Sequence, residues 1–305
     1  MSTTIYTHPD CLKHNPGPNT SYAPARLECV VDALKDARFD ALSWSSEIAL
    51  EHADLLRVHD QDYLDDVFAP ISPEEPRQFD AHTWAVNGTE QALRAATGLV
   101  VAAVKDVAAQ KTRHAFCLTS PGGHHAETAM ALDFCFINHV AVGAALAQHL
   151  GFARVAVIDI DAHHGNGTQN MFWNDPDRLC ISLHEESGLS GFADETGRAD
   201  NILNIPLPSG CDGAAYQSLF QEQVLPKLGD FKPDFIFVSA GFDACRNDPL
   251  ATLTLDISDY QLLGHSLAAA ANDLCEGRLV SVMEGGYNLE QLGDCAAAFV
   301  AGLMA

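Results

Sequence analysis

The sequence predicts an α/β fold in which helices flank a central, mainly parallel β-sheet. Short runs of apolar and β-branched residues alternate with longer segments of helical periodicity, a pattern typical of parallel sheets that are covered on both faces. Of the 305 residues, 47% are hydrophobic and only 19% are charged, which is enough apolar material for one large core. Because no repeat, low-complexity run or long linker divides the chain, we expect a single domain over residues 1–305.

The individual elements follow from periodicity. Apolar residues that recur every three to four positions predict helices at 89–107, 138–150, 217–228, 259–274 and 292–304. Short apolar runs predict strands at 113–119, 154–160, 178–183, 235–239 and 279–283. Residues 68–77 contain three prolines and are predicted to form a surface loop.

Composition excludes several classes of function. With 17 Lys and Arg against 41 Asp and Glu, the net charge is −24, which disfavours binding to nucleic acids or to anionic membranes. The chain starts with neither a basic nor an apolar targeting segment, and no apolar run is long enough to cross a membrane. Nine scattered cysteines without a CxxC pair indicate reduced thiols, so we expect a cytoplasmic protein.

Polar residues cluster directly after four of the predicted strands. The clusters are Ser-Pro-Gly-Gly-His-His125, Asp161-Ala-His-His-Gly-Asn-Gly167, Ala-Gly-Phe-Asp243 and Glu-Gly-Gly-Tyr287. Because ligands bind at the carboxyl ends of strands in open parallel sheets, these clusters predict one shared site at that edge.

Two of the clusters predict a metal site. Asp159, Asp161 and His163 alternate along a strand end and so point to one side, where two carboxylates and an imidazole suit a divalent cation. Asp243, which follows Gly241 at another strand end, is the natural third ligand beside Asp161 and His163. The alternative is a pair of capping carboxylates with a structural histidine, but unpaired buried carboxylates are costly without a cation.

The remaining clusters suggest acid–base chemistry. His124 and His125 titrate near neutral pH and can exchange a proton beside a metal, with Asp159 and Asn166 as partners that orient the two rings. Tyr287 can donate its hydroxyl to a developing oxyanion. Taken alone, a His-His pair or a single Tyr is more often structural. Together they predict metal-assisted hydrolysis of an acyl group.

These motifs resemble those of the histone deacetylase / acetylpolyamine amidohydrolase family, and most closely its class II branch and bacterial-type members. The match extends from about Arg26 to Leu289, in the family's order and spacing. The matching motifs are Pro-Gly-Gly-His-His-Ala-Glu127, Asp159-Ile-Asp-Ala-His-His-Gly-Asn-Gly-Thr-Gln169, Ser239-Ala-Gly-Phe-Asp243 and Glu284-Gly-Gly-Tyr-Asn-Leu289. The resemblance implies an arginase/deacetylase-like fold with its active site at the carboxyl ends of the strands.

The resemblance also implies roles for individual residues. It implies a catalytic zinc ion bound by Asp161, His163 and Asp243. It makes His125 the general base and acid, oriented by Asn166, and gives His124 an electrostatic role, oriented by Asp159. Tyr287 would polarise the scissile carbonyl, and Arg26 would lie beneath the active site.

Members of the family also bind monovalent cations, usually potassium. The positions that match the first such site are Asp159, Asp161, His163, Ser182 and Leu183. Those that match the second, mainly through backbone carbonyls, are Phe172, Asp175 and Arg178. Donors that are mostly hard oxygen would let the catalytic site accept Fe²⁺ or Co²⁺ as well as Zn²⁺.

The substrate tunnel departs from the family pattern. Its expected positions are Asp133, Phe134, Ser187, Leu189, Phe192, Leu250 and Gly285. Leu250 stands where polyamine-selective relatives carry an acid, which favours an acyl-lysine substrate. Asp133 replaces the usual glycine and, with the acidic loop that follows Glu185, could instead receive a distant ammonium group.

The leading hypothesis is therefore a zinc-dependent deacylase that acts on an acylated lysine or a similar primary amine. An acetylpolyamine amidohydrolase, which a homo-oligomer would suit, is the alternative within the family. A non-catalytic module that binds acylated amines and a binuclear manganese ureohydrolase agree less well with a complete set of ligands, His124-His125 and Tyr287.

Overall fold

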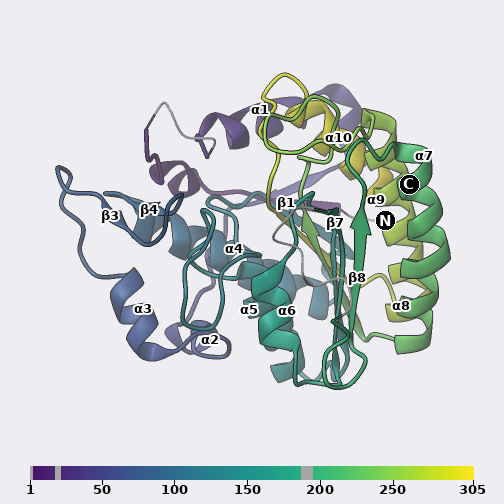
Figure 1. Ribbon diagram of the computed structural model, residues 1–305, viewed down its shortest axis with the longest axis horizontal. Helices are drawn as coiled ribbons and strands as arrows, with labels where there is room; N and C mark the ends of the chain where they lie inside the picture. Colours follow the sequence, from purple (N-terminus) through teal and green to yellow (C-terminus); the bar gives the residue numbers. More distant parts are fainter. Residues whose placement is uncertain (1–2, 18–21, 187–194) are drawn as a thin grey trace.

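A parallel β-sheet runs through the centre of the protein. The structure is a computed structural model that describes residues 3–17, 22–186 and 195–305. Within these residues, eight parallel strands form a sheet in the order β2-β1-β5-β10-β9-β6-β7-β8 (Figure 1). The strands are β1 (Thr3–Tyr6), β2 (Ser43–Ser45), β5 (His114–Cys117), β6 (Val155–Asp159), β7 (Arg178–Glu185), β8 (Ile202–Leu207), β9 (Phe235–Ala240) and β10 (Leu279–Met283).

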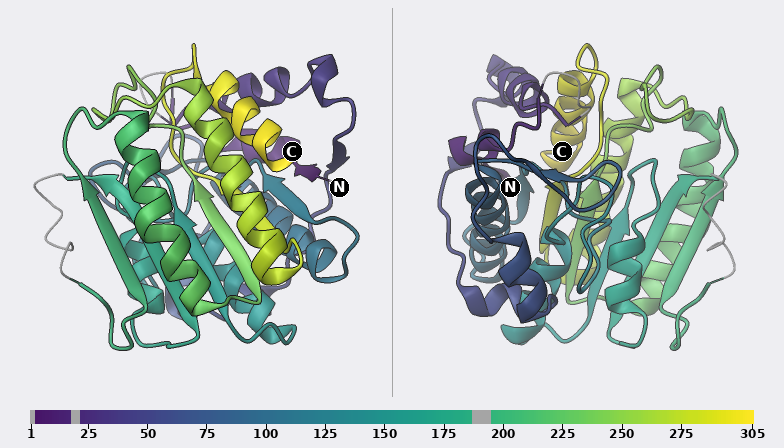
Figure 2. Two further views of the ribbon diagram at one scale, coloured as in Figure 1. Left: turned by 90° about the vertical axis from the view of Figure 1, so that its right-hand side faces the viewer. Right: turned by 60° about the vertical axis from the view of Figure 1, so that its left-hand side comes forward.

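Helices cover both faces of this sheet (Figures 1 and 2). One face carries α4 (Thr89–Ala108), α5 (His139–His149) and α6 (Asn166–Phe172). The other carries α7 (Gly213–Leu219), α8 (Leu225–Phe231), α9 (Ile257–Cys275) and α10 (Leu292–Leu303), with a π-helical turn (Phe220–Val224) that joins α7 to α8. Helix α1 (Ala25–Ala33) packs on α10.

Short elements form the periphery. They are 3₁₀ turns at Pro9–Lys13 and Ala37–Phe39, the helices α2 (His52–Leu55) and α3 (Gln61–Val67), and the antiparallel pair β3 (Arg77–Gln78) and β4 (Trp84–Ala85). The predicted loop at residues 68–77 is confirmed as a mostly exposed connection between α3 and β3. None of the described helices is long and apolar enough to span a bilayer.

The predicted α/β fold is confirmed, with all five predicted helices and all five predicted strands in place. The predicted helix at 217–228 lies within the longer helical segment from α7 to α8. Strands β1, β2 and β8 were not predicted. Strands β1 and β2 have only four and three residues, and β8 contains Pro206, which a sheet tolerates because β8 is an edge strand.

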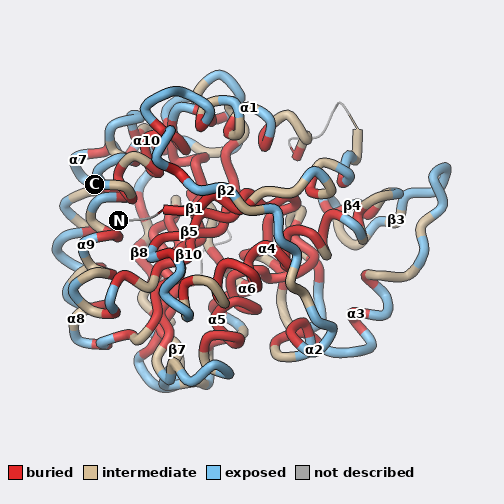
Figure 3. The backbone as a smooth tube through the Cα atoms, turned by 180° about the vertical axis from the view of Figure 1, so that it is seen from behind, coloured by how far each residue is buried: buried red, intermediate tan, exposed pale blue. Residues whose placement is uncertain are grey.

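The core lies on both sides of the four central strands (Figure 3). Every residue of β5, β6, β9 and β10 is buried, as expected for parallel strands covered on both faces. All nine cysteines are free thiols, and eight of them are buried. These central strands give the loops at their carboxyl ends a rigid base.

Candidate active site

The four predicted polar clusters meet at one edge of the sheet. The strands that precede them, β5, β10, β9 and β6, are consecutive neighbours in the sheet. In the register of this sheet, Asp159 at the end of β6 is paired with Ser239 of β9 and with Ser182 of β7. The clusters are distant in sequence, but they converge because parallel strands end side by side.

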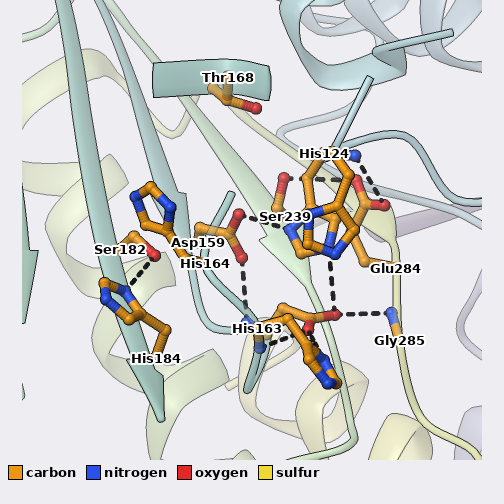
Figure 4. Close-up of polar contacts among 12 residues, drawn as sticks. His124, Asp159, His163, His164, Thr168, Ser182, His184, Ser239, Glu284 and Gly285 are labelled. Carbon is orange, nitrogen blue, oxygen red and sulfur yellow. Dashed lines mark hydrogen bonds and ion pairs between the residues drawn. The ribbon is translucent and has the colours of Figure 1, made fainter. Parts of the chain in front are cut away.

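The predicted metal ligands lie within reach of a single ion. One ligand atom each of Asp161, His163 and Asp243 lies within 4.8 Å of the others. His163 Nδ1 is 3.1 Å from a carboxylate oxygen of Asp161 and 2.9 Å from one of Asp243 (Figure 4). A Cβ atom at Gly241 or Gly285 would come within 2.2 Å of these carboxylates, so both positions require glycine.

The two predicted histidines lie against each other beside this group, and each has a hydrogen-bond partner. Their ring centroids are 4.0 Å apart. His124 Nδ1 lies 2.9 Å from a carboxylate oxygen of Asp159, and His125 Nδ1 lies 2.8 Å from the amide oxygen of Asn166. Because both partners accept hydrogen bonds, each Nδ1 carries the proton, and Nε2 of His125 is left to accept one.

The surroundings of the two imidazoles shift their pKa values in opposite directions. Burial opposes protonation of His124, but the carboxylates of Asp159 and Asp161 outweigh it and raise the pKa of His124 to about 10. Burial, together with the charge of His124, holds the pKa of His125 well below its ordinary value. At neutral pH, His124 is therefore the charged ring and His125 the neutral one.

The pKa values of the two ligand carboxylates shift in opposite directions. Burial opposes ionisation of Asp161, but the charge of His124 and the hydrogen bond to His163 outweigh it and hold the pKa of Asp161 well below its ordinary value. Burial, followed by the charge of Asp161, raises the pKa of Asp243 to about 7. Both carboxylates are at most 1% exposed, so this part of the site concentrates negative charge away from solvent.

Aromatic contacts hold Tyr287 at the same edge. Its ring centroid lies 5.8 Å from that of Tyr22 and 6.5 Å from that of Phe134, and the Arg26 guanidinium lies 4.9 Å from it. Its backbone N–H donates to Asp248 at 2.7 Å. Burial raises the pKa of Tyr287 well above its ordinary range, which keeps the hydroxyl protonated and able to donate.

Phe134, whose ring lies near that of Tyr287, and Asp133 have an unusual backbone conformation. Both are left-handed, with φ values of 68° and 40°. The N–H of Asp133 donates to Asp80 at 2.8 Å, and the N–H of Phe134 donates to the Thr83 hydroxyl at 2.9 Å. Strained backbone of this kind persists only where its surroundings hold it. Sequence reasoning missed Asp80, because an aspartate in a loop carries no periodic signal.

A cavity of about 170 Å³ lies beside Phe134. The side chains that line it are His14, Pro16, His82, Trp84, Phe134 and Phe136. The His82 ring stacks on Phe134, and His82 Nδ1 lies 2.9 Å from Asp133. Aromatic surface and the Asp133 carboxylate therefore lie close together beside Phe134.

The other expected tunnel positions differ in their surroundings. Leu250 is 41% exposed, and its N–H donates to Asp248, which also holds the backbone of Tyr287. Gly285 lies against the metal-ligand carboxylates, and its N–H donates to Asp161 at 2.7 Å. Ser187, Leu189 and Phe192 lie outside the described residues.

The positions expected for monovalent cations lie at opposite ends of β7. Ser182 and Leu183 are buried near its carboxyl end, where the Ser182 hydroxyl contacts His184 Nδ1 at 2.9 Å. At its other end, Phe172 ends α6, Arg178 begins β7, and Asp175 lies in the turn between them. Carbonyl oxygens of all three accept hydrogen bonds from one amide nitrogen, Nδ2 of Asn201.

Glu284 is a further buried carboxylate that sequence reasoning did not assign to the site. It is 1% exposed and accepts the N–H groups of Gly123 at 2.6 Å and of His124 at 3.3 Å (Figure 4). The Ser239 hydroxyl donates to its other oxygen at 3.4 Å. Glu284 thus connects the end of β10 to the turn that carries both histidines. Its position directly before Gly-Gly-Tyr287 was the available signal.

Comparisons with known proteins agree with this geometry. The sequence profile of the histone deacetylase domain matches residues 20–303. A probable deacetylase of Archaeoglobus fulgidus is 34% identical over 95% of this chain and 82% of its own length. A histone deacetylase-like amidohydrolase of Pseudomonas aeruginosa is 38% identical over 81% of this chain and 67% of its own length.

A solved structure is similar over nearly the whole chain. The crystal structure of the HDA15 HD domain superimposes with a TM-score of 0.91 at 31% identity, and covers 99% of this chain and 92% of the solved one. The Arabidopsis thaliana protein named histone deacetylase 15 is 37% identical in an aligned region that covers 73% of this chain and 41% of that protein's length.

Proposed function

Because this chain belongs to the histone deacetylase family, we propose that it is a zinc-dependent hydrolase that removes an acetyl-type group from lysine or a similar primary amine. Deacetylase-type amide hydrolysis follows from the family. The zinc ion, the proton transfers and the substrate are the proposal. The observation that carries it is the Asp161–His163–Asp243 group next to a neutral His125 and a protonated Tyr287.

The donor set suits zinc. Two carboxylates and one imidazole leave a fourth position open, which is the usual arrangement of a catalytic zinc site. A zinc ion bound there would supply Lewis acidity that polarises the substrate carbonyl and lowers the pKa of a water molecule. The same donors would also hold Fe²⁺ or Co²⁺.

His125 moves the proton. Its Nδ1–H is held by Asn166, so Nε2 accepts a proton from the attacking water and later returns it to the departing amine. His124 is charged and held by Asp159, and it stabilises negative charge near the reacting carbonyl without exchanging a proton itself.

Tyr287 supplies the hydrogen bond to the oxyanion. As the carbonyl carbon becomes tetrahedral, its oxygen gains negative charge, and the protonated hydroxyl donates to it. The aromatic contacts of the ring limit the movement that would otherwise weaken this bond.

We also propose a potassium ion beside the catalytic centre. The candidate ligands are Asp159, Asp161, His163, Ser182 and Leu183. Asp159 and Ser182 are register partners on adjacent strands, which gives this group a rigid base. An additional cation would offset the charge of two buried aspartates.

The substrate is an acylated amine, and two classes remain candidates. The exposed, apolar Leu250, at a position expected to line the tunnel, suits acyl-lysine, since it offers no charge to a second amine. Asp133, which contacts the His82 ring stacked on Phe134, favours acylpolyamines, whose distal ammonium groups bind carboxylates and aromatic faces.

A turnover panel with metal analysis tests both levels of the proposal. The zinc-loaded protein is offered acetyl-lysine peptides, longer acyl-lysines and acetylated putrescine, cadaverine and spermidine. Hydrolysis of any of these amides that stops on chelation and returns with zinc supports the metal-dependent reaction, and a preference of about tenfold, or 1.4 kcal/mol, assigns the substrate class. A metal-replete protein that hydrolyses none of them contradicts the proposal.

A further inference from the structure

Asn201 binds a turn that the resemblance associates with a second potassium ion. Its side-chain nitrogen donates to the carbonyl oxygens of Phe172 at 2.8 Å, Asp175 at 3.0 Å and Arg178 at 2.8 Å. These are the three positions expected to present carbonyls to that ion. A single amide nitrogen thus occupies the position at which one ion bound by all three oxygens would lie.

The orientation of the Asn201 amide is determined by its partners. Carbonyl oxygens only accept hydrogen bonds, so three of them require the NH₂ group rather than the amide oxygen. The amide oxygen has its own donor, the N–H of Ala199 at 3.4 Å. Asn201 is 2% exposed, and its backbone carbonyl accepts the N–H of Cys180 in the ladder between β7 and β8.

A ring of carbonyl oxygens that replaces water around a potassium ion works because each oxygen presents its negative dipole to the cation. The NH₂ group of an amide presents positively polarised hydrogens to the same oxygens. Here the nitrogen lies at nearly equal distances from all three oxygens, in the space that a cation bound by them would need.

We propose that the Asn201 amide substitutes for the second monovalent cation, so that this turn binds no potassium. The turn joins α6 to β7, and α6 begins at Asn166, the partner of His125. The protein thereby holds this part of its scaffold with a covalently attached group, and its potassium dependence is confined to the site beside the catalytic centre. This inference concerns the scaffold and does not depend on the proposed reaction.

Isosteric replacement offers the sharpest test. Asn201→Asp replaces the NH₂ group with an anionic oxygen that faces three carbonyls, which is unfavourable unless a cation lies between them. Asn201→Ala removes the NH₂ donor and leaves the carbonyls of Phe172 and Asp175 only the backbone N–H groups of Asp175 and Arg178. The matched control is Asn138→Ala, because Asn138 is also a buried asparagine whose amide nitrogen donates to a carbonyl, that of Ala126, without a ring of carbonyls around it.

The first readout is the thermal midpoint in potassium chloride and in tetramethylammonium chloride at equal ionic strength. We expect potassium to raise Tm of Asn201→Asp by at least about 3 °C more than that of the wild type, roughly the effect of one hydrogen bond's free energy in a domain of this size. Asn138→Ala should lose stability without this additional response. An equal potassium response in all three proteins would refute the substitution.

The second readout can overturn the proposal with the wild-type protein alone. Crystals of the wild-type protein soaked in thallium(I), used as a heavy substitute for potassium, should show no anomalous peak at the carbonyls of Phe172, Asp175 and Arg178. Crystals of an Asn201 variant should show one there. A thallium peak among these carbonyls in the wild type would overturn the proposal, even if neither variant folds.

Discussion

Replacing Tyr287 with phenylalanine should remove one hydroxyl while leaving the site in shape. Tyr22, Phe134 and Arg26 contact the ring of Tyr287 rather than its oxygen, so phenylalanine retains these contacts. The backbone bond from Tyr287 N–H to Asp248 is also retained. The substitution therefore isolates the contribution of a single hydrogen-bond donor.

The expected loss in kcat follows from the stage of the reaction at which the Tyr287 hydroxyl forms its hydrogen bond. Donors to an oxyanion contribute about 10²–10³ in kcat, or about 2.7–4 kcal/mol, because they act mainly on the transition state. KM should change by no more than about twofold, because this hydrogen bond contributes little to the binding of the substrate before it reacts. Tm should change by no more than about 1 °C, because the packing of the ring is preserved.

Steady-state kinetics on the best amide of the substrate panel, with zinc content and Tm measured on the same samples, would test this prediction. Tyr6→Phe is the matched control: the Tyr6 hydroxyl donates to Asp106 at 2.9 Å, so its loss should lower Tm and leave kcat unchanged. If Tyr287→Phe turned over like the wild type, or lost activity only in proportion to lost zinc, Tyr287 would not be the oxyanion donor.

Three further predictions concern metal binding, loop positioning and acid stability. Asp243→Ala should lose both zinc, measured by elemental analysis, and activity, and a metal-replete active variant would exclude Asp243 as a ligand. Glu284→Met fills the same space without an acceptor and should lower kcat at least about tenfold with little change in KM, whereas Glu284→Gln should retain most activity. Faster hydrogen exchange of the backbone amides that Glu284 holds would be the independent sign, and full activity of the Met variant would contradict the role. Burial lowers the pKa of His14, His59 and His139 from 6.5 to about 4, so the unfolded chain binds more protons between these values. The contribution of these histidines to stability is thus fully present above about pH 6.5, and the free energy of unfolding should fall towards pH 4 by up to about 1.4 kcal/mol per pH unit for each histidine. In urea unfolding repeated across this pH range, the free energy of unfolding of His14→Gln should fall less steeply with decreasing pH than that of the wild type.

Much of the candidate site could be predicted because parallel strands bring distant segments together by rule. The segments that end in His125, His163, Asp243 and Tyr287 each follow a buried strand, and these strands are neighbours in the sheet. Once the runs are recognised as strands, the meeting of the clusters depends on sheet geometry alone and not on any particular contact. The same reasoning overlooked β8, because Pro206 interrupts its apolar run.

The residues that were missed act through single hydrogen bonds between distant segments. Asp80 holds the backbone of Asp133, 53 positions away, and Glu284 holds that of Gly123, 161 positions away. Asn201 reaches carbonyls 23 to 29 positions earlier. Sequence periodicity does not identify such a residue, because a polar side chain in a loop gives the same sequence pattern whether it faces solvent or a buried N–H.

The acidic residues that give the net charge of −24 lie both at the surface and, buried, in the candidate site. Among the described residues, the buried acids are Asp54, Asp159, Asp161, Asp243, Asp248 and Glu284, and all but Asp54 hold or line the candidate site. Asp54 has its own partner in Arg57, whereas the basic groups nearest to the metal-site acids are the imidazoles of His124 and His163. Buried carboxylates in such number are costly unless cations offset them. We expect the excess acid at the surface to attract cationic amines and the buried acids of the site to bind cations, so metal binding and folding stability should be coupled in this protein.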